Sequence, residues 1–362
     1  MLKQIVSLTI GLLLLVFISC TPKGDDKSSH PVLSKSIEYD VTINNFKMFS
    51  EWGLNTSGAF WYRNNLEGSV RGAFMELLFK NALTGKLELY DMNDKLIDTN
   101  RLKVILLASV DSITATRTEP PYAMYDTVIN KTIQPEEITA LRFREDWTYD
   151  PSTMAIKKKV IAFAPIWTPI GYDKDGNETY GENKTLFWVK WSKEPANTKV
   201  LTKRIVSVTN YIGISSLEKA THVDSIAIQK YMNFFIDKVF KDSIAAYDVT
   251  AGDLTTFPIS GKDLYKLLNR TDTIKQKRTE PPYDTYDTII KHTANVNAIR
   301  FMEEWSFDPV TMAIEKKVVG ICPVELCYDM TGQFKGYKPY FWVYFADVWK
   351  PFDGKLELKK KK

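Results

Sequence analysis

One stretch of this sequence is written twice, and this internal repeat constrains the fold more than any other feature. Arg117–Ile129 (RTEPPYAMYDTVI) returns as Arg278–Ile290 (RTEPPYDTYDTII), with 10 of 13 positions identical. Leu141–Ile166 returns as Ile299–Val324, with 14 of 26 identical. Weaker matches surround both segments. Each unit of about 130 residues is large enough to bury a core and too long for a solenoid repeat. We therefore predict a tandem duplication of a globular domain.

Each copy begins with a helical pattern. Apolar residues recur at steps of three and four from Val70 to Ala82, and Gly85 is placed to end this helix. The second copy repeats the stripe from Ile228 to Val239, with Asp224 as its N-cap. A second short helix is predicted over 261–269, where Ser260 and Asp263 resemble a capping box, and over 101–109 in the first copy.

The second half of each copy has the pattern of antiparallel strands. Apolar and polar residues alternate over 141–149, and Asp150-Pro151 then indicates a turn. Further strands are predicted over 159–164 and 187–189, and over 317–322 and 341–343 in the second copy. These patterns predict an α+β fold of two tandem homologous domains, each an N-terminal helical part followed by an antiparallel β meander.

A Glu-Pro-Pro-Tyr motif precedes the strand region of both copies. Pro120-Pro121 and Pro281-Pro282 restrict the backbone to extended conformations and remove two successive hydrogen-bond donors. We expect each motif to form a polyproline-like segment along an edge or a groove.

The chain begins like a bacterial lipoprotein. A short basic start and an apolar run over 5–18 lead to Ile18-Ser19-Cys20, which predicts a cleaved signal peptide and lipidation of Cys20. The residues that follow are polar and suit a flexible tether. No aspartate directly follows Cys20, so the inner-membrane retention signal of enterobacteria is missing. The predicted boundaries are 1–19 for the signal peptide, 20–40 for the tether, 41–197 for domain 1, 198–220 for a linker, 221–352 for domain 2 and 353–362 for a basic tail.

Composition excludes several classes of site. With Cys20 lipidated, only Cys322 and Cys327 remain, and they form either a local disulfide or two free thiols. The three histidines lie apart from each other and from the cysteines, so we expect no metal and no cofactor. A net charge of +4 with interspersed acids and bases gives no indication of nucleic acid binding.

Two acidic pairs are the strongest catalytic candidates, Glu145-Asp146 and Glu303-Glu304. Neighbouring residues of a strand point to opposite faces, so neither pair alone places two carboxylates in one cleft. We expect Asp146 to pair with Arg142 or Arg144, and Glu145 to cap or pair at a sheet edge. No other catalytic motif occurs, and the protein is predicted not to be an enzyme.

Four tryptophans recur at matching positions in the two copies: Trp147, Trp188, Trp305 and Trp342. Aromatic side chains at alternating strand positions usually pack in a core. The alternative is a platform on which a cell-surface lipoprotein would bind glycan or peptide.

These motifs resemble the GldN/PorN family. The resemblance rests on the run Arg-Phe-x-Glu-(Asp/Glu)-Trp-x-(Tyr/Phe)-Asp, on the closing Phe-Trp-Val, and on Phe74–Phe79 followed by Gly85–Asp91, with Ala245–Asp248 as the counterpart in copy two. It covers most of the chain after residue 40.

The resemblance implies a non-enzymatic role in the gliding motility and type IX secretion apparatus of Bacteroidetes. It implies a GldK/PorK-like lipoprotein and a GldM/PorM-like protein as partners, and assembly into a large homo- or hetero-oligomeric ring. Together with the lipid anchor, it places the protein on the outer membrane, at the periplasmic face in preference to the cell surface.

Overall fold

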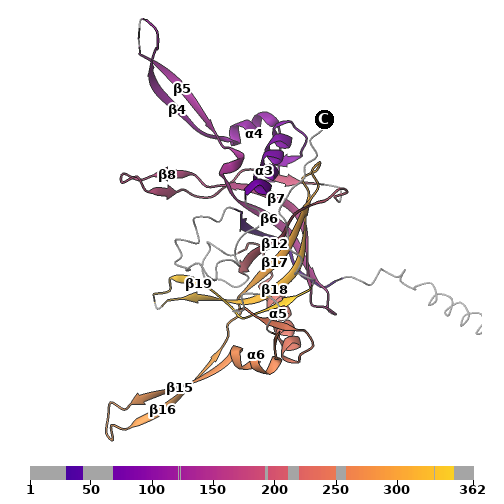
Figure 1. Ribbon diagram of the computed structural model, residues 1–362, viewed down its shortest axis with the longest axis vertical. Coiled ribbons are helices and arrows are strands. Elements are labelled where there is room, and N and C mark those ends of the chain that lie inside the picture. The colour runs from indigo at the N-terminus through magenta and orange to yellow at the C-terminus, as the bar shows by residue number, and fades with distance from the viewer. Residues whose placement is uncertain are drawn as a thin grey trace, which may run out of the picture. The chain divides into compact units, whose positions relative to one another are not determined.

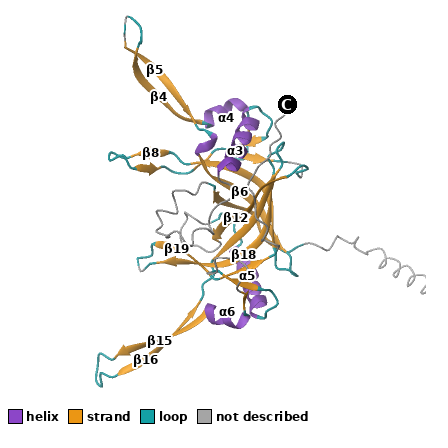
Figure 2. Cartoon of the chain, viewed as in Figure 1, coloured by secondary structure: helices purple, strands orange, loops and turns teal. Residues whose placement is uncertain are grey.

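The computed structural model describes residues 30–43, 68–120, 122, 124–191, 195–210, 220–249, 258–329 and 331–345. The predicted signal peptide, Cys20 and the predicted basic tail lie outside these ranges. The chain from Val32 onward forms one compact unit that contains both copies. It combines helices with antiparallel strands (Figures 1 and 2). No helix of the described residues is long and apolar enough to cross a membrane.

The two copies share the order of their principal elements, but copy one has an additional 3-10 helix and a different set of short strands near its end. Copy one comprises β1 (Val32–Thr42), α3 (Gly68–Leu83), β2 (Leu89–Tyr90), β3 (Leu96–Ile97), α4 (Thr99–Ile105), β4 (Leu107–Thr116), β5 (Met124–Thr132), the 3-10 helix η2 (Pro135–Glu137), β6 (Ile138–Tyr149), β7 (Ile156–Trp167), β8 (Ile170–Tyr172), β9 (Glu178–Tyr180), β10 (Lys184–Thr185) and β11 (Trp188–Lys190). Copy two comprises β12 (Lys199–Asn210), α5 (Ser225–Phe240), β13 (Ala246–Asp248), β14 (Pro258–Ile259), α6 (Gly261–Leu268), β15 (Asn269–Lys277), β16 (Thr285–Thr293), β17 (Ala298–Phe307), β18 (Ile314–Tyr328), β19 (Phe334–Pro339) and β20 (Phe341–Tyr344).

Three of the four predicted helices form where the sequence pattern places them, whereas α4 covers Thr99–Ile105 and the predicted residues 107–109 belong to β4. Gly85 has a φ of 67° just after α3, in the left-handed region that glycine adopts at little cost. Asp224 accepts a hydrogen bond from the Ala227 amide at the start of α5, as predicted. Ser260 likewise accepts one from the Asp263 amide at the start of α6.

A single sheet runs through both copies. In copy one β6 pairs with β1 and β7, and in copy two β17 pairs with β12 and β18. The two halves join where β7 meets β18, with Lys158 opposite Lys316. One hydrophobic cluster contains buried residues of both copies. The copies therefore share a sheet and a core.

Each copy also packs a helix against the other copy. Phe74 of α3 contacts Phe307 of β17 edge to face, with ring centroids 5.1 Å apart. Tyr231 of α5 packs against Tyr149 of β6 at 5.0 Å and donates a hydrogen bond to the Met154 carbonyl at 2.6 Å. This exchange of contacts explains why the two repeats do not separate into independent bodies.

Two predicted boundaries need correction. Residues 32–40 fall in the range expected to be a tether, yet they belong to β1 and pair with β6. The range expected to be a linker, 198–220, contains β12, which pairs with β17. In β1 the inward positions Ile37, Tyr39 and Val41 alternate with Glu38 and Asp40, which is the period-two pattern of a half-buried strand that the tether prediction did not take into account.

The Glu-Pro-Pro-Tyr motifs do not run along an edge or a groove. They form the turns of two hairpins, β4–β5 and β15–β16. In both, the tyrosine amide donates to the glutamate carbonyl at 3.0 Å, from Tyr122 to Glu119 and from Tyr283 to Glu280. Proline is common in such turns because its fixed φ suits them. The pairing of the flanking strands makes each motif a turn and not an extended segment.

Gly261 lies at the start of α6, where this helix packs closely against the end of α5. A Cβ at position 261 would lie 2.2 Å from the Phe240 carbonyl oxygen, whereas one at position 72 of α3 would meet nothing within 4 Å. Gly261→Ala is expected to lower the free energy of unfolding by about 1–3 kcal/mol because the backbone must shift. Gly72→Ala, the control, is expected to leave it unchanged or raise it by up to about 1 kcal/mol. Urea unfolding measures both, and equal effects would contradict this account of α6.

Candidate functional site

A buried charged cluster lies where the two copies meet. It consists of Glu145 and Glu303, Lys158 and Lys316, and Tyr39. Glu145 and Glu303 occupy inward positions of β6 and β17 and have no exposed surface. The Oε2 atom of each accepts a hydrogen bond at 2.8 Å from the indole nitrogen two residues further on, Trp147 or Trp305. The same Glu-x-Trp spacing in both copies thus builds the same local unit.

The lysines cross from one copy to the other. Lys158 of β7 places its Nζ 2.5 Å from Oε1 of Glu303, and Lys316 of β18 places its Nζ 2.7 Å from Oε1 of Glu145. All four side chains are fully buried. Each glutamate is therefore neutralised by a lysine of the other repeat.

Tyr39 of β1 breaks the symmetry of the cluster. Its hydroxyl accepts hydrogen bonds from Lys158 Nζ at 3.2 Å and Lys316 Nζ at 3.1 Å, and donates to Glu145 at 2.8 Å. In β12 the residue at the matching register position is Ser207. Burial, together with the charges of Glu145 and Glu303, raises the pKa of Tyr39 well above its usual value, so it stays neutral and can donate.

Aromatic rings enclose the two ammonium groups. Lys158 Nζ lies 3.3 Å from the ring centroid of Phe301, and Lys316 Nζ lies 3.0 Å from that of Phe143. The indoles of Trp147 and Trp305 are each 4.5 Å from the lysine of their own copy. A ring face attracts a cation, and the attraction is stronger where water is excluded.

Two of the buried groups, Lys316 and Glu303, have pKa values shifted by their surroundings. Burial lowers the pKa of Lys316 to about 8, with Glu145 and Glu303 acting in the opposite direction. Burial alone would raise the pKa of Glu303, but Lys158 and Lys316 outweigh it and the pKa is lowered. The cluster therefore pairs two basic side chains with two acidic ones.

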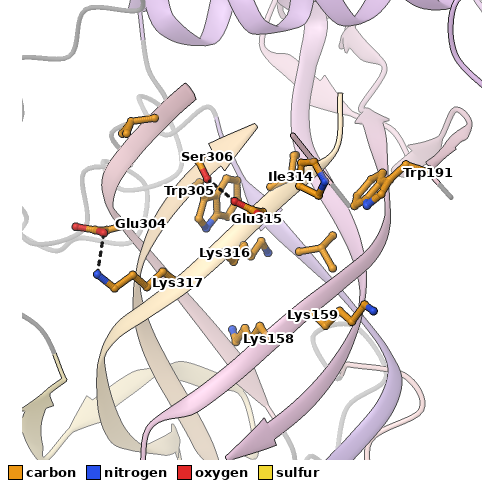
Figure 3. Close-up of a pocket in the computed structure, with 13 residues that line it drawn as sticks. Lys158, Lys159, Trp191, Glu304, Trp305, Ser306, Ile314, Glu315, Lys316 and Lys317 are labelled. Atoms are coloured by element: carbon orange, nitrogen blue, oxygen red, sulfur yellow. Dashed lines mark hydrogen bonds and ion pairs between the residues drawn. The ribbon is translucent and has the colours of Figure 1, made fainter. Parts of the chain in front are cut away.

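A cavity of about 470 Å³ lies beside the cluster, between β7, β17 and β18 (Figure 3). Its lining includes Lys317, paired with Glu304 at 3.5 Å, and Glu315, within 3.3 Å of Ser306. Lys158 and Lys316 also line it, but their side chains are fully buried, so they contribute main-chain surface. The cavity thus has no access to the buried ammonium groups, and the cluster is placed to hold the fold rather than to meet a ligand.

The acidic pairs differ from the expectation. Glu145 pairs deep in the core with a lysine, and not at a sheet edge. Asp146 accepts a hydrogen bond from the Ser36 amide at 2.9 Å, while Arg142 pairs with Asp40 and Arg144 with Glu38. Strand β1 causes the difference, because it supplies acids that the arginines reach across the strand pair.

The four tryptophans lie in the core. Trp147, Trp188, Trp305 and Trp342 are exposed by 1%, 2%, 0% and 5% of their surface. Trp147 and Trp305 lie in the main hydrophobic cluster and donate to the glutamates of the charged cluster, and Trp188 and Trp342 pack in two smaller hydrophobic clusters. This burial overturns the alternative of a glycan- or peptide-binding platform formed by these side chains.

Cys322 and Cys327 are free thiols. Both lie on β18, and five residues of extended strand separate their Cα atoms by roughly 16 Å, beyond the reach of a disulfide. Burial raises the pKa of Cys322 to about 11, so this thiol is unreactive. Among the described residues, no group of three or more His, Cys, Asp or Glu side chains could hold a metal ion.

Sequence reasoning missed Lys158, Lys316 and Tyr39. A signal for the lysines was present, because Ile156-x-Lys158-x-Val160 and its counterpart place a lysine at an inward position in both copies. A charge at an inward position needs a partner. Among the residues that the structure describes, Glu145 and Glu303 are the acids that occupy matching, fully buried strand positions in both copies. Tyr39 gave no such signal, since copy two lacks it.

The crossed ion pairs predict strong coupling across the two copies. Lys158→Met and Glu303→Gln are each expected to cost about 3–5 kcal/mol in the free energy of unfolding, because each leaves a buried charge without its partner. The double variant is expected to lose less than the sum, because neither charge is left. The same cycle on Lys241 and Asp237, an exposed pair 2.6 Å apart, serves as control and should show little coupling. Additive losses for Lys158 and Glu303 would contradict the assignment.

The lowered pKa of Glu303 predicts a dependence on acid. As the pH falls below the usual value of 4.5, the unfolded chain takes up a proton before the folded chain does. The contribution of Glu303 is therefore complete above that value and is lost as the pH falls through the folded pKa. The stability difference between the wild type and Glu303→Gln should shrink from about pH 6 to about pH 3, measured by denaturant unfolding. A constant difference would refute the prediction.

Comparison with known proteins agrees with the motifs. The sequence model of the family described as "Gliding motility associated protein GldN" matches residues 55–224 and again residues 226–353. No curated protein matches the chain. Each repeat thus carries its own match, and together the matches cover most of the 362 residues. The chain belongs to the GldN family, and so to the components of the gliding motility and type IX secretion machinery.

Proposed function

We propose that this protein is a non-enzymatic structural subunit of the gliding and type IX secretion machinery. The crossed ion pairs between Lys158 and Glu303 and between Lys316 and Glu145 are the observation that carries the proposal. These pairs use four buried charged side chains to hold the two repeats together. A rigid body built from two copies of one domain suits a load-bearing or assembly role.

The charged groups around the cavity favour the same reading. Lys317 pairs with Glu304 within the wall, and Glu315 accepts a hydrogen bond from the Ser306 hydroxyl. A catalytic site needs a nucleophile or a base that reaches the substrate, with a pKa suited to proton transfer. The lysine with a suitable pKa, Lys316, has a fully buried side chain.

The anchor and the partners complete the proposal. Ile18-Ser19-Cys20 supports lipidation of Cys20, which would attach the subunit to the periplasmic face of the outer membrane. By family, its partners would be a GldK/PorK-like lipoprotein and a GldM/PorM-like protein, in a ring-shaped assembly.

Fractionation tests the anchor. Wild-type protein is expected in the outer membrane fraction and to incorporate labelled fatty acid. Cys20→Ser is expected to lose both properties, because the acyl chains supply the membrane affinity. Cys327→Ser, at a partly exposed thiol, is the control and should keep both. Unchanged fractionation and labelling of Cys20→Ser would rule out lipidation at this residue.

Affinity purification from native membranes tests the assembly role. The full chain, tagged at its C-terminus, is expected to recover GldK- or GldM-like proteins after mild solubilisation. Recovery of the chain without any protein of the gliding or secretion machinery would count against the proposal.

A further inference from the structure

Two hairpins stand apart from the shared sheet. Strands β4 and β5 pair with each other, as do β15 and β16, and each pair forms a two-stranded sheet of its own. Figure 1 shows each hairpin extending outward from the helix before it, α4 or α6. A two-stranded ribbon of nine or ten residues a strand is marginally stable in water by itself. Each hairpin also leaves two strand edges open to pairing with another chain.

The hairpin tips are the most similar parts of the two copies. Arg-Thr-Glu-Pro-Pro-Tyr is identical at 117–122 and 278–283, within a segment that matches at 10 of 13 positions. The core segment that contains the charged cluster matches at only 14 of 26. Loop tips normally diverge faster than cores, because no packing restrains them. Here the order is reversed.

Packing within the chain does not explain this similarity. The tip residues whose side chains the structure describes are exposed in both copies, from Arg117 to Pro120 and from Arg278 to Tyr283, with Tyr122 as well. The geometry of the turn accounts for the prolines, but it does not require the same exposed arginine, threonine and tyrosine in both copies, so we attribute their similarity to something outside the chain. Because it acts on both tips, it must act on both in the same way.

The tyrosine of each tip supports this argument. Tyr122 and Tyr283 have φ angles of 51° and 54°, a left-handed conformation that is costly for a bulky residue and cheap for glycine. Tyr122 and Tyr283 are 61% and 56% exposed, so burial of the ring within the chain does not offset this cost. Strained residues of this kind persist where function requires the side chain.

We propose that the two tips are equivalent docking sites for one protein partner, so that each chain binds two copies of it. The recognised features are the tyrosine ring, the adjoining prolines and the arginine, which suit a protein cleft with apolar walls. The open strand edges beside each tip favour a protein over a glycan, because a protein strand can add to them through backbone hydrogen bonds. This inference rests on the proposed scaffold role and names its contact surface.

Two equal sites on one rigid chain have a quantitative consequence. A partner that is itself oligomeric would engage both tips, and the second contact would form at a high effective concentration. Loss of one tip should then weaken binding to an oligomeric partner by more than the twofold that the loss of one independent site would give.

Site-specific photo-crosslinking tests the proposal in the bacterium that makes the chain. A photoreactive phenylalanine analogue replaces Tyr122 or Tyr283 in the full-length protein. Tyr265 of α6 is the matched control, because it is 56% exposed and its counterpart in copy one is Val104. The expected result is one and the same polypeptide crosslinked at positions 122 and 283 and not at 265. Different polypeptides at the two tips, or label on glycan alone, would overturn the proposal.

Titration of the crosslinked protein, once purified, tests the stoichiometry. Its monomeric form is expected to bind at two sites per wild-type chain and at one per chain of Tyr122→Gly or Tyr283→Gly. The double variant should lose at least tenfold in affinity. Glycine suits the turn, so these variants should fold as well as the wild type. Two sites in either single variant would contradict the proposal.

Affinity purification with the double variant separates the two proposals. If wild type and double variant recover gliding and secretion proteins equally, the tips are not the docking sites and the scaffold role stands. If the wild type recovers none, the scaffold role itself fails. If the wild type recovers gliding and secretion proteins and the double variant does not, the result supports both the scaffold role and the docking role of the tips.

Discussion

Two lysines that reach into the opposite repeat hold this structure together. Lys158 and Lys316 face each other at the junction of β7 and β18, and each ammonium group pairs with a glutamate of the other copy. The strand pairing, the position of Tyr39 and the aromatic walls all converge on these four charges. The shared sheet depends on the register that places them.

Joining two halves of a protein through buried ion pairs carries a large desolvation cost. The removal of four charges from water costs several kcal/mol per ion, and the attraction between partners repays it only where geometry is good and other hydrogen bonds are made. The Trp147 and Trp305 indoles and the Tyr39 hydroxyl supply those bonds. An apolar junction could be as stable, but it would tolerate slippage of β7 against β18. A slip of one residue would turn Lys158 to the other face of the sheet and leave Glu303 buried without its partner, so the cluster specifies one register.

Much of the fold could be predicted from the sequence, because local patterns set it. The apolar stripe of α3, the N-cap Asp224 and the alternation in β6 each indicate their element directly. The cluster could not be read in this way, since Lys316 and Tyr39 are 277 residues apart in the chain. The prediction that the Glu-Pro-Pro-Tyr motif forms an extended segment was wrong for a related reason. Proline restricts the backbone locally, but the pairing of β4 with β5 decides whether the motif forms a turn or an extended segment.

Native-state hydrogen exchange with mass spectrometry tests the central claim that the crossed pairs make one cooperative body of two repeats. Peptides from β6 and β7 of the first copy and from β17 and β18 of the second report on the two halves separately. If the crossed pairs make one cooperative body, the amides in both sets of peptides are expected to exchange through global unfolding, with the same free energy of opening and the same denaturant dependence. Opening of one repeat at a lower free energy, while the other stays protected, would contradict it.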